Sequence, residues 1–232
     1  KKGLRKKRTR GQYINELSPE TIRYQEYSST IVEMPNYPSR IRYYLTTSEE
    51  KEFLWFRVSK VATRSILFLL SEANIKFTAE HASECHYPVN MYKDYFKFAF
   101  VRNPWDRLIS CWQSKIVDNH RLGLKEELFP KLQDFENFVD YVAENIDQEI
   151  GNRHLRLQCR MIDLSHVDYL GRFENFEEDL DEVKKVLGID VATPKINASN
   201  RKAGYREYYT DRTKDKVALL YRRDIQIFNY EY

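Results

Sequence analysis

The sequence has few of the residues that hold small domains together covalently or through metals. Three cysteines in 232 residues, Cys85, Cys111 and Cys159, are too few and too scattered for a disulfide framework or a zinc site. No group of histidine, cysteine and aspartate has the spacing of metal ligands, so no metal is expected. We expect the cysteines to be buried or incidental thiols.

Long apolar runs and a large net charge are also missing. No window holds the ~20 apolar residues of a membrane helix, so membrane attachment is expected only through a segment outside this sequence. The formal net charge is only +3, and much of the excess lies in the first ten residues, KKGLRKKRTR. We predict a disordered basic tail over residues 1–10, and no nucleic-acid partner.

The rest of the chain has the composition of one folded domain. With 42% hydrophobic residues, residues 11–232 suit a single domain with a substantial core. Residues 11–50 have no sustained period, and we predict an irregular lead-in with one edge strand around 41–45.

Strand-like and helix-like patterns then alternate. Short apolar runs predict strands, and apolar residues three and four apart predict helices. The predicted strands lie around 52–58, 74–77, 96–102 and 166–173, and the predicted helices at 63–73, 105–117, 135–146, 177–188 and 213–228. This alternation predicts an α/β fold with a parallel sheet covered on both faces.

The first strand, turn and helix read FRVSKVATRS over residues 56–65. A helix N-terminus attracts phosphate through its unpaired N–H groups, and this turn adds the Lys60 ammonium and the Thr63 and Ser65 hydroxyls. It contains no glycine, and the pattern G-x-x-x-x-G-K-[ST] is absent, so an ordinary ATP or GTP site is disfavoured.

The second turn follows the strand FKFAFV and contains Arg102, with Ser110 two helical turns further on. Both side chains are predicted to reach one anionic group over the helix start. The alternative for Arg102 is an ion pair with Asp106, one turn along the helix. Because both turns follow strands of one parallel sheet, they are expected to face one pocket.

These residues carry a resemblance to a known family. FRVSKVATRS resembles the 5′-phosphosulfate loop of sulfotransferases, and FVRNPWDRLISCW resembles their 3′-phosphate motif. YLGRFENFEEDLDEV and YYTDRTKDKVALLYRRDIQIFNY resemble later segments of the carbohydrate sulfotransferases, sulfotransferase family 2, which modify chondroitin, dermatan and related glycans in the Golgi and have bacterial relatives. Ser59, where proline is usual, and Arg64, where a small or hydroxyl residue is frequent, depart from the pattern.

The resemblance implies a three-layer αβα, P-loop-like sulfotransferase fold and the sulfuryl donor 3′-phosphoadenosine 5′-phosphosulfate (PAPS), with adenosine 3′,5′-bisphosphate as its product. It implies that Lys60 neutralises charge on the transferred group and that a basic loop closes over the nucleotide. The residues implied to bind the donor are Lys60, Val61, Ala62, Thr63, Arg64, Ser65, Arg102, Ser110, Arg201, Lys202 and Gly204.

A base must accept the proton of the acceptor hydroxyl, and histidine is the usual candidate. His81, in a context that resembles the base of uronyl 2-O-sulfotransferases, ranks first; His154, in NRHLRLQ, ranks second and His86 third. The arginine-rich stretch 152–161 offers donors to a sugar carboxylate or sulfate from Arg153, Arg156, Gln158 and Arg160, or else forms a solvated face.

The function implied is transfer of a sulfuryl group to a carbohydrate hydroxyl, within a polysaccharide of the glycosaminoglycan type. Two alternatives stay open: the same donor used on a small molecule or a protein tyrosine, and a non-catalytic module that binds polyanions. The Golgi lumen and the bacterial cytoplasm both stay open as compartments.

Overall fold

The computed structural model describes residues 38–80, 84–118, 122–193 and 204–232. Its centre is a five-stranded sheet in the order β3-β1-β2-β4-β5. The strands are β1 (Leu45–Ser48), β2 (Phe53–Phe56), β3 (Ala79–Glu80), β4 (Phe96–Val101) and β5 (Tyr169–Arg172). The predicted α/β class is confirmed.

The sheet is mixed: it contains the parallel strands that were predicted and two antiparallel strands. Strands β2, β4 and β5 run parallel, with Phe56 opposite Ala99 and Phe98 opposite Tyr169. Strand β1 is antiparallel to β2, and β3 is antiparallel to β1. The parallel part therefore consists of the strands that end at the two predicted phosphate turns and of β5.

The strand predicted at 74–77 is wrong. After α2 (Thr63–Glu72) the chain turns at Asn74, whose φ is 50°, and the Ile75 N–H bonds back to the Leu70 carbonyl. Pairing with β1 is confined to residues 79–80. The edge strand predicted at 41–45 is also displaced, because β1 begins at Leu45 and lies inside the sheet between β3 and β2.

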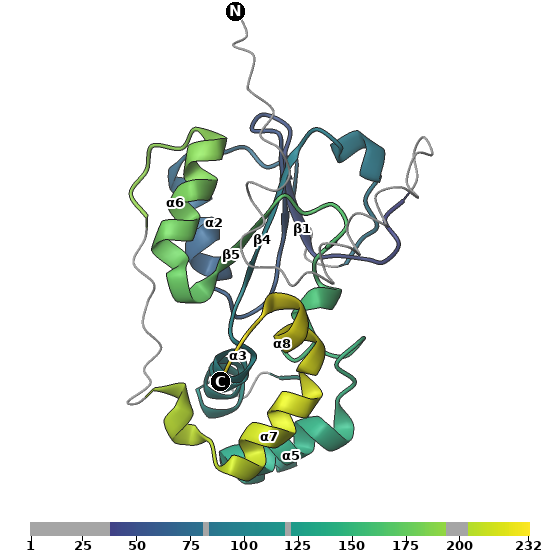
Figure 1. Cartoon of the computed structure of the whole chain (residues 1–232), viewed down its shortest axis with the longest axis vertical. Helices are drawn as coiled ribbons and strands as arrows, with labels where there is room; N and C mark the ends of the chain where they lie inside the picture. The colour runs from purple at the N-terminus through teal and green to yellow at the C-terminus, as the bar shows by residue number, and fades with distance from the viewer. Residues whose placement is uncertain (1–37, 81–83, 119–121, 194–203) are drawn as a thin grey trace, which may run out of the picture.

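Helices lie along the sheet and beyond its end (Figure 1). Helices α2 and α6 (Phe176–Leu187) lie on one side of the sheet, while α3 (Pro104–Trp112), α5 (Phe135–Asn145), α7 (Asp211–Leu220) and α8 (Arg222–Phe228) gather where β4 leads into α3. Shorter elements are η2 (Val89–Tyr92), the π-helical η3 (Gln113–Val117), η4 (Glu126–Leu128), α4 (Phe129–Leu132), η5 (Gln158–Arg160), η6 (Phe173–Asn175) and η7 (Tyr205–Tyr208).

Local sequence explains the ends of these helices. Asn103 caps α3 by accepting a hydrogen bond from the Trp105 N–H, with Pro104 at the first position, where its missing N–H costs nothing. Gly188 ends α6 in the left-handed conformation, φ 63°, which glycine adopts readily at a helix C-terminus. The helix predicted at 213–228 is divided at Tyr221 into α7 and α8, and Tyr221 is buried there with its hydroxyl on the Leu155 carbonyl.

An aromatic core covers the parallel strands. Trp55 stacks on Phe98 with ring centroids 5.9 Å apart, and Phe98 also meets Phe53, Phe96 and Phe100. Gly171 of β5 is required by this packing, because a Cβ there would lie 2.4 Å from the Phe100 ring. The packing fixes β4 against β5 and thereby the position of the turn after β4.

Within the described segments, no helix combines the length and apolarity needed to span a bilayer. The three cysteines are free, and Cys111 and Cys159 are buried. The predicted tail at 1–10 and most of the lead-in lie outside the described residues, so the assignment of one domain to 11–232 stays a prediction.

Candidate functional site

The β2–α2 loop, residues 59–62, has an unusual backbone. Lys60 and Ala62 both have left-handed φ values, 73° and 62°, although neither is glycine. Left-handed residues beside right-handed ones turn successive N–H groups toward one concave point, which attracts anions. The loop thus has left-handed residues, as phosphate-binding turns do, at positions where glycine is usual.

Two arginines of the second motif hold this backbone. Arg102 donates from Nη1 to the Lys60 carbonyl at 3.1 Å, and Arg107 donates from Nε to the Ser59 carbonyl at 3.0 Å. A non-glycine residue in this conformation costs about 1–2 kcal/mol, and such strain persists where surrounding contacts determine it. The fixed arginine donors supply those contacts, which explains how the loop keeps its shape without glycine.

The first turn of α2 leaves the N–H groups of Thr63 and Arg64 without an acceptor among the described residues, while the Ser65 N–H donates to the Ala62 carbonyl at 2.9 Å. Its N-cap, Ala62, has no side-chain hydrogen bond to offer, and the turn contains no acidic residue. The predicted Thr63 hydroxyl instead donates to the Val58 carbonyl at 2.8 Å, while Val61 is fully buried. Of the predicted donor-binding residues in this loop, Val61 and Ala62 therefore offer only backbone, and Arg64 is exposed.

The Lys60 side chain points toward the helix that follows β4. Its ammonium donates to the Ser114 hydroxyl, which the π-helical turn η3 presents. Burial is the main cause that lowers the pKa of Lys60 to about 8, and the positive charges of Arg102, Lys115 and Arg64 act in the same direction. An anion bound here would stabilise the charged lysine, offset the cost of its burial and raise its pKa.

Arg102 is almost completely buried, at 3% exposure. The alternative considered from the sequence is present: its Nε and Nη2 both lie 2.7 Å from Asp106 Oδ2. Its guanidinium also lies 3.7 Å from the centre of the Phe173 ring. The side chain is therefore fixed between the two motifs, and Ser110 lies on α3, which begins two residues after Arg102, and is 9% exposed.

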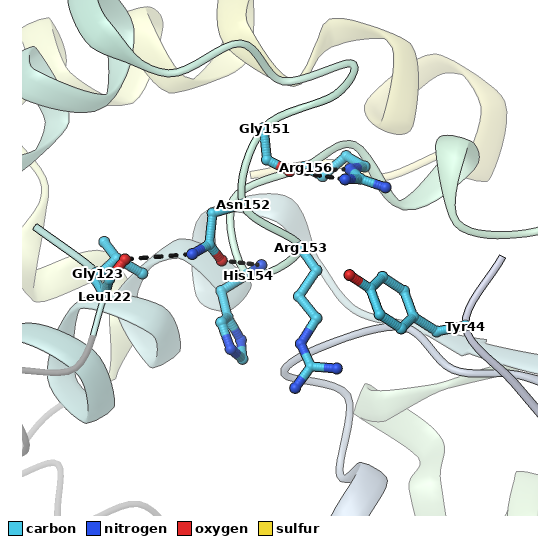
Figure 2. A pocket seen from close by; sticks show the side chains of 8 residues that line it. All are labelled: Tyr44, Leu122, Gly123, Gly151, Asn152, Arg153, His154 and Arg156. Atoms are coloured by element: carbon cyan, nitrogen blue, oxygen red, sulfur yellow. Dashed lines mark hydrogen bonds between the residues drawn. The ribbon is translucent and has the colours of Figure 1, made fainter. Parts of the chain in front are cut away.

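A shallow pocket of about 390 Å³ opens beside this junction. Figure 2 shows His154 and Arg153 pointing the same way from one segment, with Tyr44 opposite Arg153. The Arg153 guanidinium lies 5.0 Å from the centre of the Tyr44 ring. The remaining lining residues are Leu122, Gly123, Gly151, Asn152 and Arg156.

His154 is held as a neutral imidazole. Burial, followed by the charges of Lys115, Arg153, Lys60 and Arg107, lowers the pKa of His154 to about 3. Its Nδ1 is buried and has no hydrogen-bond partner among the described residues. A neutral imidazole can accept a proton from a bound hydroxyl, but a pKa near 3 makes His154 a weak base in the free protein.

Only one of the four polar residues predicted to meet a sugar group keeps its side chain available within the described structure. Gln158 is fully buried; its Oε1 accepts from the Arg102 N–H, and its Nε2 donates to the Arg102 carbonyl. The prediction that Gln158 contacts a sugar group is therefore wrong. Arg156 is paired with Glu84, and Arg160 with Glu149. Arg153 remains, on the wall of the pocket.

Several predicted residues are not brought to this site or cannot be placed. His81, Arg201 and Lys202 lie outside the described residues. His86 is occupied by the Ser39 carbonyl at 2.8 Å from its Nδ1. Gly204 is described, and its N–H donates to Glu207 at the start of η7.

Sequence reasoning missed Arg107, Ser114 and Tyr44. Arg107 and Ser114 lie in or next to the second motif, three and four residues from Ser110, so helical spacing from Ser110 was an available signal. Tyr44 comes from the poorly patterned region before β1, and nothing in its sequence context separated it from the other tyrosines.

The described residues contain no cluster of three or more histidine, cysteine or acidic side chains that could hold a metal ion.

The sequence profile of the sulfotransferase family matches residues 43–231, more than half of the chain. The protein belongs to the sulfotransferase family, and the resemblance seen in the motifs is confirmed.

Two carbohydrate sulfotransferases are among the similar proteins. Carbohydrate sulfotransferase 11 of Rattus norvegicus is 25% identical over 235 residues, covering 81% of this chain and 67% of the relative. Carbohydrate sulfotransferase 10 of Homo sapiens is 28% identical over 171 residues, covering 60% of this chain and 48% of the relative. The aligned region thus spans about half of the latter protein. No solved structure gives a significant match.

The strained loop yields a prediction about stability. Replacing Ala62 by glycine should raise the free energy of unfolding by about 1 kcal/mol, because glycine adopts a left-handed φ without the Cβ clash. For a chain of this size the melting temperature should rise by about 2–4 °C. The control is Ala73→Gly at the other end of α2, where φ is −75° and glycine should destabilise. Equal effects of the two substitutions would contradict the strain at Ala62.

Proposed function

We propose that the protein transfers the sulfuryl group of PAPS to a hydroxyl of a carbohydrate. The observation that carries the proposal is the contact between the two motifs, Arg102 Nη1 on the Lys60 carbonyl. It joins two cationic sites that follow adjacent parallel strands, β2 and β4, and a nucleotide with phosphates at both its 5′ and 3′ positions requires two such sites. Bound PAPS would supply an activated sulfate ester whose leaving group is a phosphate anion.

The residues of the first loop fit the 5′ end of such a donor. The N–H groups of α2 and the Lys60 ammonium would neutralise the charge that grows on the bridging oxygen as the bond to sulfur breaks. Arg102 and Ser110 would hold the 3′-phosphate, and this phosphate would compete with Asp106 for the guanidinium. Arg201, Lys202 and Gly204 are proposed to close over the nucleotide.

The pocket beside His154 fits the acceptor. Its volume of about 390 Å³ is within the usual range for small-ligand sites. Tyr44 offers an aromatic face to a sugar ring, and Arg153 offers donors to its hydroxyls or to an acidic substituent. His154 would accept the proton of the attacking hydroxyl, and anionic substrates that neutralise the surrounding cations would raise its basicity. His81 stays an alternative base.

The relatives support the acceptor class, because both are carbohydrate sulfotransferases by name. The test is transfer of labelled sulfate from PAPS to a panel of acceptors: sulfated and unsulfated polysaccharides, phenols and a tyrosine peptide. Label on a polysaccharide alone is the expected result. Label on phenol or peptide would overturn the carbohydrate assignment, and no label on any acceptor, with steeply salt-dependent polyanion binding, would favour a binding module.

A further inference from the structure

Arg107 of α3 is a buried arginine that uses its guanidinium on backbone carbonyls. It is 2% exposed, and its Nε, Nη1 and Nη2 donate to the carbonyls of Ser59, Arg156 and Arg153 at 3.0, 2.9 and 3.1 Å. Within the described residues it forms no ion pair with a carboxylate. A buried charge is costly unless it is hydrogen-bonded, so these three carbonyls are what keep the guanidinium in place.

The carbonyls belong to two segments far apart in the chain. Ser59 immediately precedes Lys60, and Arg153 immediately precedes His154. In the described structure no hydrogen bond runs directly between residues 59–62 and residues 152–157. Arg107 therefore connects the loop that holds the transferred group to the segment that presents the candidate base.

We propose that Arg107 is a positioning residue that fixes the separation of Lys60 and His154 across the transfer site. The inference rests on the proposed function. A planar guanidinium has donors that diverge in fixed directions, whereas a lysine ammonium offers one point charge. Lysine at this position would keep the charge and lose the simultaneous contact with both segments.

The test is Arg107→Lys in the full chain, with Tyr221→Phe as the matched control. Tyr221 is also buried and donates to the Leu155 carbonyl of the same segment at 2.8 Å, but in the described structure no hydrogen bond joins it to residues 59–62. The expected result is a kcat about 100-fold lower for Arg107→Lys, since a misplacement near 1 Å costs that much. Binding of adenosine 3′,5′-bisphosphate should weaken by a smaller factor than kcat, because Arg102 still holds the Lys60 carbonyl although the contact with the Ser59 carbonyl is lost. Tyr221→Phe should retain kcat within about threefold.

A second readout does not need activity. Titration of His154 by NMR should give a pKa near 3 in the wild type, since Lys60, Lys115, Arg153 and Arg107 add to burial in lowering it. The pKa of His154 should rise toward its usual value in Arg107→Lys, as the segment moves away from Lys60, and stay low in Tyr221→Phe. If the wild type transfers no sulfate, the proposed function is wrong. The titration would still show whether Arg107 positions the segment that carries His154.

If Arg107→Lys does not fold, hydrogen exchange of the wild type can test whether the two segments are coupled. If Arg107 holds the two segments together, the hydrogen-bonded amides beside them, Ser65 and Ile66 in α2 and residues 155–157, should open together with one shared protection factor. Independent opening of the two segments would overturn the proposal. So would a folded Arg107→Lys that retains full kcat and a low His154 pKa.

Discussion

Replacing Lys60 with alanine is expected to lower kcat by about 10²–10³, the usual cost of removing one group that stabilises developing charge. Lys60 is the lysine of the β2–α2 loop, and its ammonium donates a hydrogen bond to Ser114. The fold should survive, because the side chain has no carboxylate partner among the described residues. Initial rates with saturating PAPS, beside a melting curve, measure both effects.

The matched control is Lys115→Ala, which removes a nearby lysine from η3. Lys115 lowers the pKa of both Lys60 and His154 through its charge, but it does not lie on the phosphate-binding loop. Its removal should reduce kcat by less than about tenfold. Equal losses in the two variants would mean that general positive charge, and no specific contact of Lys60, supports the reaction.

The pH dependence of the wild type follows from the same lysine. In the proposed mechanism Lys60 must be protonated to stabilise the leaving group, and its pKa in the free protein is lowered to about 8. The ratio kcat/KM, which reports the free enzyme, should therefore fall as pH rises through about 8. If His154 is the base, no fall is expected between pH 7 and 5, because its pKa of about 3 keeps it neutral there. An activity loss centred near pH 6.5 would instead indicate an unperturbed histidine.

Replacing Arg102 with alanine should have the largest effect on stability and should abolish the preference for a 3′-phosphate. The Asp106 carboxylate would lose its buried partner, which costs about 3 kcal/mol or more, and the melting temperature should drop by about 6–12 °C. Adenosine 3′,5′-bisphosphate at a hundredfold excess over its Kd should stabilise the wild type by about 2.7 kcal/mol. Neither ATP nor AMP should match this shift, and Arg102→Ala should lose it.

Asp106→Asn separates the two roles of Arg102. It removes the competing carboxylate and leaves the guanidinium, so bisphosphate binding should be retained or strengthened although the buried ion pair is gone. Loss of binding in both variants would show that the ion pair only shapes the turn. Equal thermal shifts with the bisphosphate, ATP and AMP in the wild type would defeat the assignment of a 3′-phosphate site.

Local pattern predicted the elements that carry the two motifs. The apolar runs before Lys60 and Arg102 and the helical spacing after each turn are determined by neighbours in sequence. Strand β1 and the turn at Asn74 were misplaced because tertiary pairing decides them: β1 lies between two partners, and no local period records that.

The site shows the same division. Lys60 and Arg102 were identifiable from residue type and place, and the structure brings them into contact. Gln158 looked like a polar surface residue, yet it is buried as a partner for the backbone of Arg102. Arg107 looked like an ordinary helical charge because its three acceptors are backbone carbonyls 46–49 residues away, and carbonyls leave no signature in a sequence.

The glycine-free loop has a consequence for protein engineering. A glycine-rich phosphate loop carries its conformational freedom within itself and can be transplanted as a short cassette. Here the left-handed turn at Lys60 and Ala62 depends on donors from Arg102 and Arg107, more than 40 residues away along the chain. The smallest portable unit is therefore the pair of motifs on adjacent strands, and a graft of residues 56–65 alone is expected to relax into an ordinary turn.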